Sequence, residues 1–201
     1  MRTLMVFLAM IALTGCIVYT QPITRVSAEL YVEDEGQNDY YVSMENYYRV
    51  PEREIIIIRD RGIPYDEMPV VLFISQRARV TPTVIIDLRR RNMSWMDITL
   101  YYRLSPDIFY VPVQSGPPHG NAYGHYMNKP KKQWKQMSFK DDEIVNLVNL
   151  KFVSEHNKQK PGEIIKMREN GNDFKAINHN IRKNKNKNKN NDDDDYGKDK
   201  R

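Results

Sequence analysis

Few residues in this chain have the types and spacing that chemistry requires. The histidines are His119, His125, His156 and His179. None has a cysteine partner or the ligand spacing of a known zinc motif. The acids Asp141, Asp142 and Glu143 suit the first turn of a helix, where the helix dipole favours negative charge. The chain contains no P-loop, G-x-S-x-G or G-x-G-x-x-G motif. We therefore expect no metal, no cofactor and no enzymatic activity.

The only cysteine, Cys16, follows an apolar N-terminal stretch. Arg2 precedes residues 4–13, which are too few to span a bilayer comfortably, so residues 1–15 are predicted to be a secretory signal peptide. The sequence Leu13-Thr14-Gly15-Cys16 resembles the lipobox of bacterial lipoproteins. That resemblance implies that Cys16 becomes the first mature residue and carries a diacylglyceryl group, usually with an N-acyl chain such as palmitate. The alternative is an ordinary buried cysteine in a signal peptide or membrane anchor.

Acyl chains on Cys16 predict a membrane partner and a location in the cell envelope. Each buried CH₂ contributes about 0.8 kcal/mol, so two or three long chains would hold the protein to a bilayer. Ile17 follows the cysteine, whereas an aspartate there marks retention in the inner membrane in enterobacterial-type sorting. We therefore expect a lipid-anchored protein on the outer membrane, facing the periplasm. A single cysteine also excludes an internal disulfide.

One short phrase occurs three times in the chain and predicts its architecture. The copies are EIIIIRDRGIPYDEM at 54–68, VIIDLRRRNMSWMDI at 84–98 and EIIKMRENGNDFKAI at 163–177. Each has two isoleucines, an arginine, a turn residue, an aromatic residue, and an Ile or Met three positions later. The turn residues Gly62, Asn92 and Gly171 are the types that tolerate the left-handed conformation closing a helix. Each copy therefore predicts a helix, a tight turn and a second helix.

The predicted fold is all-α: a small array of short helices built from three helix-turn-helix-like repeats, with a long irregular loop and disordered termini. Helices are expected at 51–61, 66–79, 82–91, 94–102, from 106, at 139–156 and from 161. Across the 201 residues the mean hydropathy is -0.69, because very polar ends flank an apolar middle. The predicted parts are a signal peptide 1–15, a lipidated acidic tether 16–46, a helical domain with two repeats 47–110, a Gly/Pro-rich loop 111–137, a helical segment with the third repeat 138–182, and a disordered Lys/Asn/Asp tail 183–201.

These features favour a lipid-anchored envelope protein whose helical array is a non-catalytic scaffold or interaction module. They are similar to those of uncharacterised small lipoproteins of Gram-negative bacteria, a resemblance that implies no activity. The expected partners besides the membrane are another envelope protein or an anionic polymer. Seven residues could form a binding surface: Arg89, Arg90, Arg91, His119, Tyr123, His125 and Tyr126.

Two other classes of function remain open. The repeated phrase with its Ser/Thr-Pro helix start resembles the helix-turn-helix of resolvase-like and sigma-factor-like DNA readers, and a pI of ≈ 9.1 suits nucleic acid. Nucleic acid is not the favoured partner, because a lipoprotein outside the cytoplasm does not meet the chromosome. The third class is an envelope enzyme that acts on cell-wall glycan with carboxylates near the long loop.

Overall fold

The structure, a computed structural model, describes residues 34–113 and 129–195, with the backbone alone for 188–195. Within these ranges the chain is all-helical and has no strand, which confirms the predicted fold class. None of the described helices is long and apolar enough to cross a bilayer. The helices are α1 Glu35–Tyr48, α2 Glu52–Asp60, α3 Met68–Ala78, α4 Pro82–Arg90, α5 Trp95–Tyr101, the 3-10 helix η2 Pro106–Phe109, α6 Lys131–Trp134, α7 Asp141–Asn157, α8 Pro161–Glu169 and α9 Phe174–Asp195.

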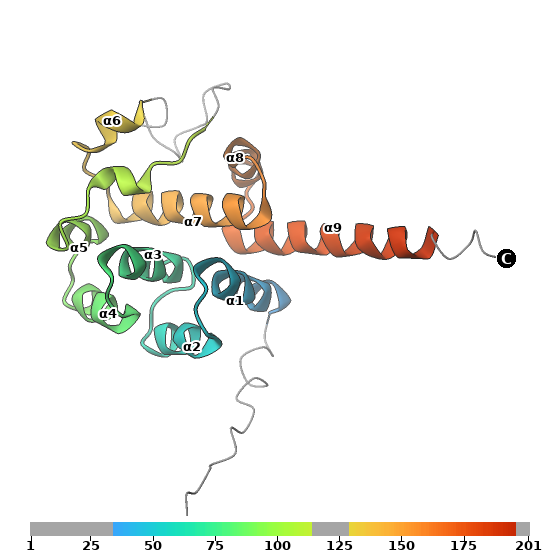
Figure 1. The fold of residues 1–201 in the computed structure, drawn as a ribbon, viewed down its shortest axis with the longest axis horizontal. Helices are drawn as coiled ribbons and strands as arrows, with labels where there is room; N and C mark the ends of the chain where they lie inside the picture. The colour runs from blue at the N-terminus through green and yellow to red at the C-terminus, as the bar shows by residue number, and fades with distance from the viewer. Residues whose placement is uncertain (1–33, 114–128, 196–201) are drawn as a thin grey trace, which may run out of the picture.

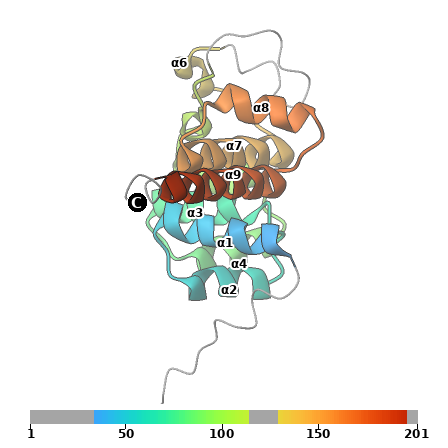
Figure 2. The same ribbon diagram turned by 90° about the vertical axis from the view of Figure 1, so that its right-hand side faces the viewer.

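The helices pack in successive layers (Figures 1 and 2). α2 and α4 lie side by side on the outside, and α1 and α3 cover them. α7 and α9 form the next layer, in which α7 packs on α3 and α9 packs on α1. α8 lies on the far side of that layer and contacts both α7 and α9. The layers place α3 and α7 at the centre, where both are covered on two sides.

Burial follows from this layering. Every residue of α3 from Met68 to Ser75 is buried, as expected for a helix that is apolar on all sides. The outer helices α2, α4 and α8 each bury two isoleucines completely, and their other residues are partly or fully exposed. In the second part of the chain, Trp134 of α6 is fully buried beside Tyr110 and Phe139. This tryptophan therefore packs α6 onto the rest of the helical core.

Four helix ends use the same closure. A basic residue with positive φ follows the helix, and a proline two or three positions later stands at or next to the start of the following helix. These residues are Arg49, Arg79, Arg103 and Lys158, with φ of 54°, 56°, 55° and 57°. The next N–H bonds back into the finished helix, as from Val80 to the Ser75 carbonyl at 3.0 Å. A cation at this position also complements the helix dipole. The predicted helix starts at Pro82 and Pro106 are confirmed.

The predicted acidic tether 16–46 is wrong in its last part, because α1 begins at Glu35. Asp34 caps this helix by accepting a hydrogen bond from the Gly36 N–H at 2.9 Å. The helix buries Tyr40 and Met44 completely. Acidic composition predicted an unfolded spacer, but the acids lie between tyrosines that face the core. Residues 1–33 lie outside the described residues.

The acids of α1 hold α9 in place. Asp39 pairs with His179 Nδ1 at 2.6 Å and with Arg182 Nε at 3.2 Å. Asn178 Nδ2 donates to Ser43 Oγ at 3.0 Å, and Asn178 is itself fully buried. α1 and α9 are far apart in the sequence, so these polar contacts fix a long-range pairing that composition does not reveal.

α9 also extends further than expected. The tail 183–201 is predicted to be disordered from composition, yet α9 is one helix from Phe174 to Asp195. Its first turns bury Phe174, Ile177 and Ile181, and Lys185 Nζ donates to the Asn157 carbonyl at 2.7 Å. Helix propagation from such an anchored start costs far less than nucleation. The end of α9 projects beyond the other helices in Figure 1, and residues 196–201 lie outside the described residues.

His156, near the end of α7, makes the stability of this fold depend on pH. Burial lowers its pKa below 6.5, and nearby Arg182 and Lys185 lower it further. The folded-state pKa of His156 is depressed, so the protein prefers the neutral imidazole. The contribution of His156 to the free energy of unfolding is therefore fully present above about pH 6.5 and is lost as the pH falls towards the folded-state pKa. We expect the free energy of unfolding to decline as the pH falls below about 6.5, and His156→Phe to flatten that decline.

Urea unfolding at several pH values measures this effect. The Phe substitution keeps an aromatic ring against Phe152, whose centroid lies 6.0 Å from that of His156. A variant that loses stability as steeply as the wild type over this range would show that His156 is not responsible.

Candidate binding cleft

The three repeated phrases form three similar local structures. Their first helices are α2, α4 and α8, and each ends in a turn residue with positive φ. The φ values are 80° at Gly62, 61° at Asn92 and 87° at Gly171. Ser94 caps α5 by accepting from the Asp97 N–H at 3.0 Å, and Asp173 accepts from the Ala176 N–H at 2.7 Å. The positive φ at each turn residue is the conformation that its residue type predicts.

The arginine shared by the copies closes the turn in the second and third. Arg89 donates to the Met93 carbonyl at 3.2 Å, and its guanidinium lies 4.7 Å from the centroid of Trp95. Arg168 donates to the Asn172 carbonyl at 2.9 Å and lies 4.6 Å from the centroid of Phe174. The arginine therefore ties the end of the first helix to the aromatic residue that begins the second.

The first copy departs from this pattern. Arg59 forms a hydrogen-bonded pair with its neighbour Asp60 at 2.8 Å. The aromatic residue of the copy, Tyr65, donates instead to Asp173 at 3.2 Å. The first and third copies are thus connected through Tyr65, although they are separated by about half of the chain.

Arg89 is the centre of a larger network. Its Nε and one Nη donate to the two carboxylate oxygens of Glu67 at 3.1 and 3.2 Å, and it also pairs with Asp141. Asp141 in turn accepts from the Trp95 N–H at 2.7 Å. Burial works against the charge of Arg89, but the hydrogen bonds to the two acids outweigh it and raise its pKa. This network joins α4, α5 and α7 to the segment that leads into α3.

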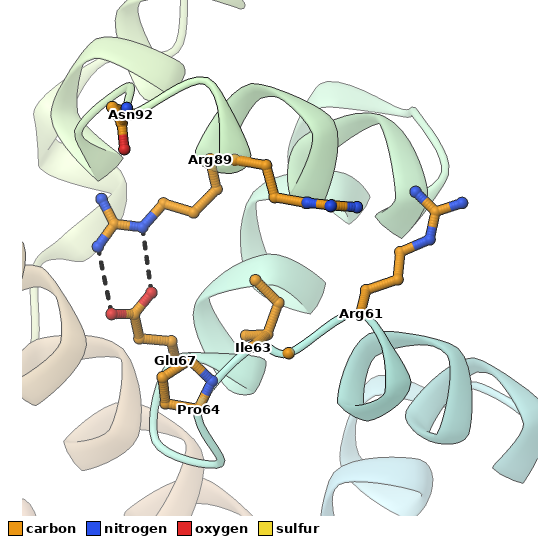
Figure 3. A pocket seen from close by; sticks show the side chains of 8 residues that line it. Arg61, Ile63, Pro64, Glu67, Arg89 and Asn92 are labelled. Carbon is orange, nitrogen blue, oxygen red and sulfur yellow. Dashed lines mark hydrogen bonds and ion pairs between the residues drawn. The ribbon is translucent and has the colours of Figure 1, made fainter.

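A cleft lies between the turns of the first two copies. α2 packs beside α4, so the turn after each helix meets the other. The cleft has a volume of about 370 Å³ and is lined by Arg61, Gly62, Ile63, Pro64, Glu67, Arg89, Arg90 and Asn92. In Figure 3, Glu67 and Arg89 face each other at one end and Arg61 stands at the other. We call this space the turn cleft.

A second, acidic hollow adjoins it. This hollow has a volume of about 260 Å³, shares Glu67 with the turn cleft and is otherwise lined by Asp66, Asp141, Asp142, Val145 and Asn146. In the described part of the chain no group of three or more acids, histidines or cysteines is arranged to hold a metal ion. Asp141 accepts hydrogen bonds from the Arg89 guanidinium and the Trp95 N–H, and Glu143 accepts from the Lys140 N–H at 2.8 Å. These two acids therefore have structural partners, as their place at a helix start predicts.

The structure separates the predicted binding residues into three groups. Arg89 is committed to Glu67 and Asp141, so it supports the turn cleft rather than offering a free charge. Arg90 lines the turn cleft and is exposed, and Arg91 is exposed next to it but does not line the cleft. The other four predicted residues, His119, Tyr123, His125 and Tyr126, and also Cys16, lie outside the described residues.

Sequence reasoning missed two residues of the cleft, Arg61 and Glu67. Arg61 occupies the same position in the first phrase as Arg91 in the second, so aligning the copies could have identified it. Glu67 carries no such signal, because its importance comes from Arg89, which lies 22 positions away in the sequence.

The second helices of the first two copies, α3 and α5, are unsuited to be DNA recognition helices because of their burial and exposed residues. A recognition helix must leave one face free to enter the major groove. α3 is buried from Met68 to Ser75, so it has no such face. α5 is only 7 residues long, and the residues that it exposes, Asp97, Leu100 and Tyr101, carry no positive charge to pair with phosphates.

Comparison of this chain with protein families, with curated proteins and with solved structures finds no match in any of the three. Any function must therefore be argued from the residues themselves.

Proposed function

We propose that this protein is a lipid-anchored component of a bacterial cell envelope, in which the helical domain is a non-catalytic interaction module. The observation that carries the proposal is Leu13-Thr14-Gly15-Cys16 at the end of a short apolar stretch. Acyl chains attached to Cys16 would hold the protein to a membrane through burial of their CH₂ groups. The expected side of attachment is the periplasmic face of the outer membrane.

The position of the first helix supports this arrangement. α1 begins at Glu35, so residues 17–34 separate Cys16 from the helical domain. An extended chain spans about 3.3–3.6 Å per residue, which is ample to hold a domain clear of lipid headgroups. The predicted tether is thereby shortened, but its proposed role is kept.

The interaction role rests on the turn cleft. The polar network around Arg89 stabilises the packing of helices and leaves the cleft open to solvent. Of the three acids considered for an enzyme, Asp141 accepts from the Trp95 N–H within this network, and Glu143 caps the start of α7 by accepting from the Lys140 N–H. A surface that is held rigid by internal contacts is suited to binding another molecule.

Substitution of Cys16 tests the lipid anchor. In cells labelled with a fatty-acid analogue, we expect the wild-type protein to carry label and to sediment with membranes. Cys16→Ala should lose the label completely and remain uncleaved, because no thiol is left for alkylation. Thr14→Ser is the matched control, since it keeps a small residue in the lipobox and should retain the label. Labelled Cys16→Ala, or an unlabelled and unprocessed wild type in the cytoplasm, would refute the proposal.

A further inference from the structure

Two arginines of the turn cleft, Arg61 and Arg90, are not required by the fold. The turn positions of Arg61 and Arg91 correspond to Asn170 in the third copy, and that of Arg90 corresponds to Glu169. The third copy nevertheless forms the same turn, with Gly171 at φ 87°. Arg89, in contrast, matches Arg168, and both close their turns. The positive charges of Arg61 and Arg90 therefore need an explanation other than folding.

The charges of these arginines are available for a ligand. The side chain of Arg90 has no hydrogen bond or ion pair to any other residue in the described chain. Arg61 pairs with Asp87 at 2.8 Å, but the two side chains are 37% and 55% exposed. Exposed pairs of this kind contribute little to stability, so Arg61 can exchange its partner at small cost. Glu67, the one acid that lines the cleft, is already held by Arg89 in a bidentate pair.

The shape of the cleft fits a group larger than a simple ion. Its volume of about 370 Å³ falls within the range of small-molecule sites. Ile63 and Pro64 give it an apolar wall, and a Cβ built on Gly62 would meet no atom within 4 Å. The space next to the turn backbone is therefore open, with cationic side chains beside an apolar surface.

We propose that the turn cleft binds an oxyanion group, a phosphate or a carboxylate, carried on a ligand of about the size of a sugar. The planar guanidinium group donates two parallel hydrogen bonds to either oxyanion, which makes arginine the preferred partner for both. Asp66 and Asp142 of the neighbouring hollow repel the same anion, so they confine it to the side of Arg61 and Arg90. This proposal specifies the ligand class of the interaction module proposed above, so it rests on the binding role of that module. It does not rest on the lipid anchor.

Three hexoses that differ in one group test the proposal. The full-length protein in detergent is titrated calorimetrically, at low salt, with glucose 6-phosphate, glucuronate and glucose. We expect one or both charged sugars to bind and glucose not to bind. The stronger of the two identifies the ligand as a phosphate or a carboxylate.

Two double variants locate the site. Arg61→Gln/Arg90→Gln should weaken the binding by about tenfold or more, because each lost bidentate contact removes a charge-assisted pair. Arg53→Gln/Lys166→Gln removes the same charge from other exposed positions and should leave the affinity within about twofold, because exposed charges at a distance are screened by salt. Circular dichroism confirms that the variants are folded, and Arg90→Gln alone, at an exposed position, should show part of the loss.

The result that would overturn the proposal is no binding of either charged sugar, equal binding of glucose, or equal weakening in both double variants. The outcome is independent of the lipid anchor, because the titration does not depend on acylation of Cys16. A failure here would leave the membrane-anchor proposal standing, and a failure of the anchor test would leave this one standing.

Discussion

Replacing Arg89 with methionine should lower the free energy of unfolding by about 2–3 kcal/mol, since it removes one partner of a mostly buried ion-pair network. The substitution keeps an apolar stem of similar length but leaves Glu67 and Asp141 without their cation. The side chains of Arg89 and Glu67 are 20% and 21% exposed, and that of Asp141 is 35% exposed. This partial exposure places the expected cost below that of a fully buried pair. Urea unfolding followed by circular dichroism measures it.

Two matched variants separate the contributions. Arg168→Met removes the same contact to a turn carbonyl and the same stacking on an aromatic ring, but no ion pair with an acid among the described residues. It should therefore cost about 1–2 kcal/mol, the sum expected for one hydrogen bond and one cation–π contact, and less than Arg89→Met. Arg90→Met, at the exposed neighbouring position, should stay within about 0.5 kcal/mol of the wild type.

The order of these three effects is the critical result. Equal losses in Arg89→Met and Arg168→Met would mean that Glu67 and Asp141 add nothing to the role of Arg89. A loss greater than about 0.5 kcal/mol in Arg90→Met would mean that the exposed arginine supports the fold. Its charge would then not be available to a ligand.

Replacing Asn149 with leucine should cost about 3 kcal/mol, because two buried polar groups lose their partner and each costs about 1–3 kcal/mol. Asn149 is fully buried in α7 and accepts a hydrogen bond from the Tyr40 hydroxyl of α1. Its amide donates to the Asp66 carbonyl before α3 at 2.7 Å. Leucine has the same number of side-chain heavy atoms and the same branching at Cγ, so the substitution leaves no cavity. Burial and the nearby charge of Asp66 raise the pKa of Tyr40 well above 10.0, so its hydroxyl stays protonated as the donor.

A double-mutant cycle isolates the Tyr40 contact. Tyr40→Phe alone should cost about 1–2 kcal/mol, because it leaves the Asn149 oxygen unpaired. In the double variant the two remaining side chains are apolar, so the total loss should be smaller than the sum of the single losses by about 1 kcal/mol. Additive losses in unfolding experiments would show that the two side chains do not depend on each other.

The local structure could be predicted well because its signals are local. The turn residues Gly62, Asn92 and Gly171 have positive φ, as their types predict. The helices that start at Pro82 and Pro106 begin where a hydroxyl residue and a proline predict them. One boundary was less accurate: the helix predicted from residue 139 begins at Asp141, and Phe139 packs near Phe109 instead. The backbone preferences of single residues decide such features, and these preferences can be read from the sequence alone.

The longer-range features were missed because their partners are far away in the sequence. α1 looked like an acidic spacer, since Phe152, whose ring packs on Tyr40, lies more than 100 residues downstream. The α1–α9 contacts of Asp39 and the extension of α9 were invisible for the same reason. Of the candidate cleft, the sequence suggested Arg89 and Arg90 but not the roles that distinguish them.

By itself, the sequence determined that the described chain is all-helical, where its turns fall, and that Cys16 stands in a lipobox-like context. These properties depend on residue type and on spacing within one or two helical turns. Only the tertiary structure decided that the turns of the first two phrases meet in a cleft and that Arg89 is bound internally while Arg90 stays exposed. The physical reason is that a charge is free or neutralised according to what packing brings within about 4 Å of it, and packing joins residues without regard to their distance along the chain.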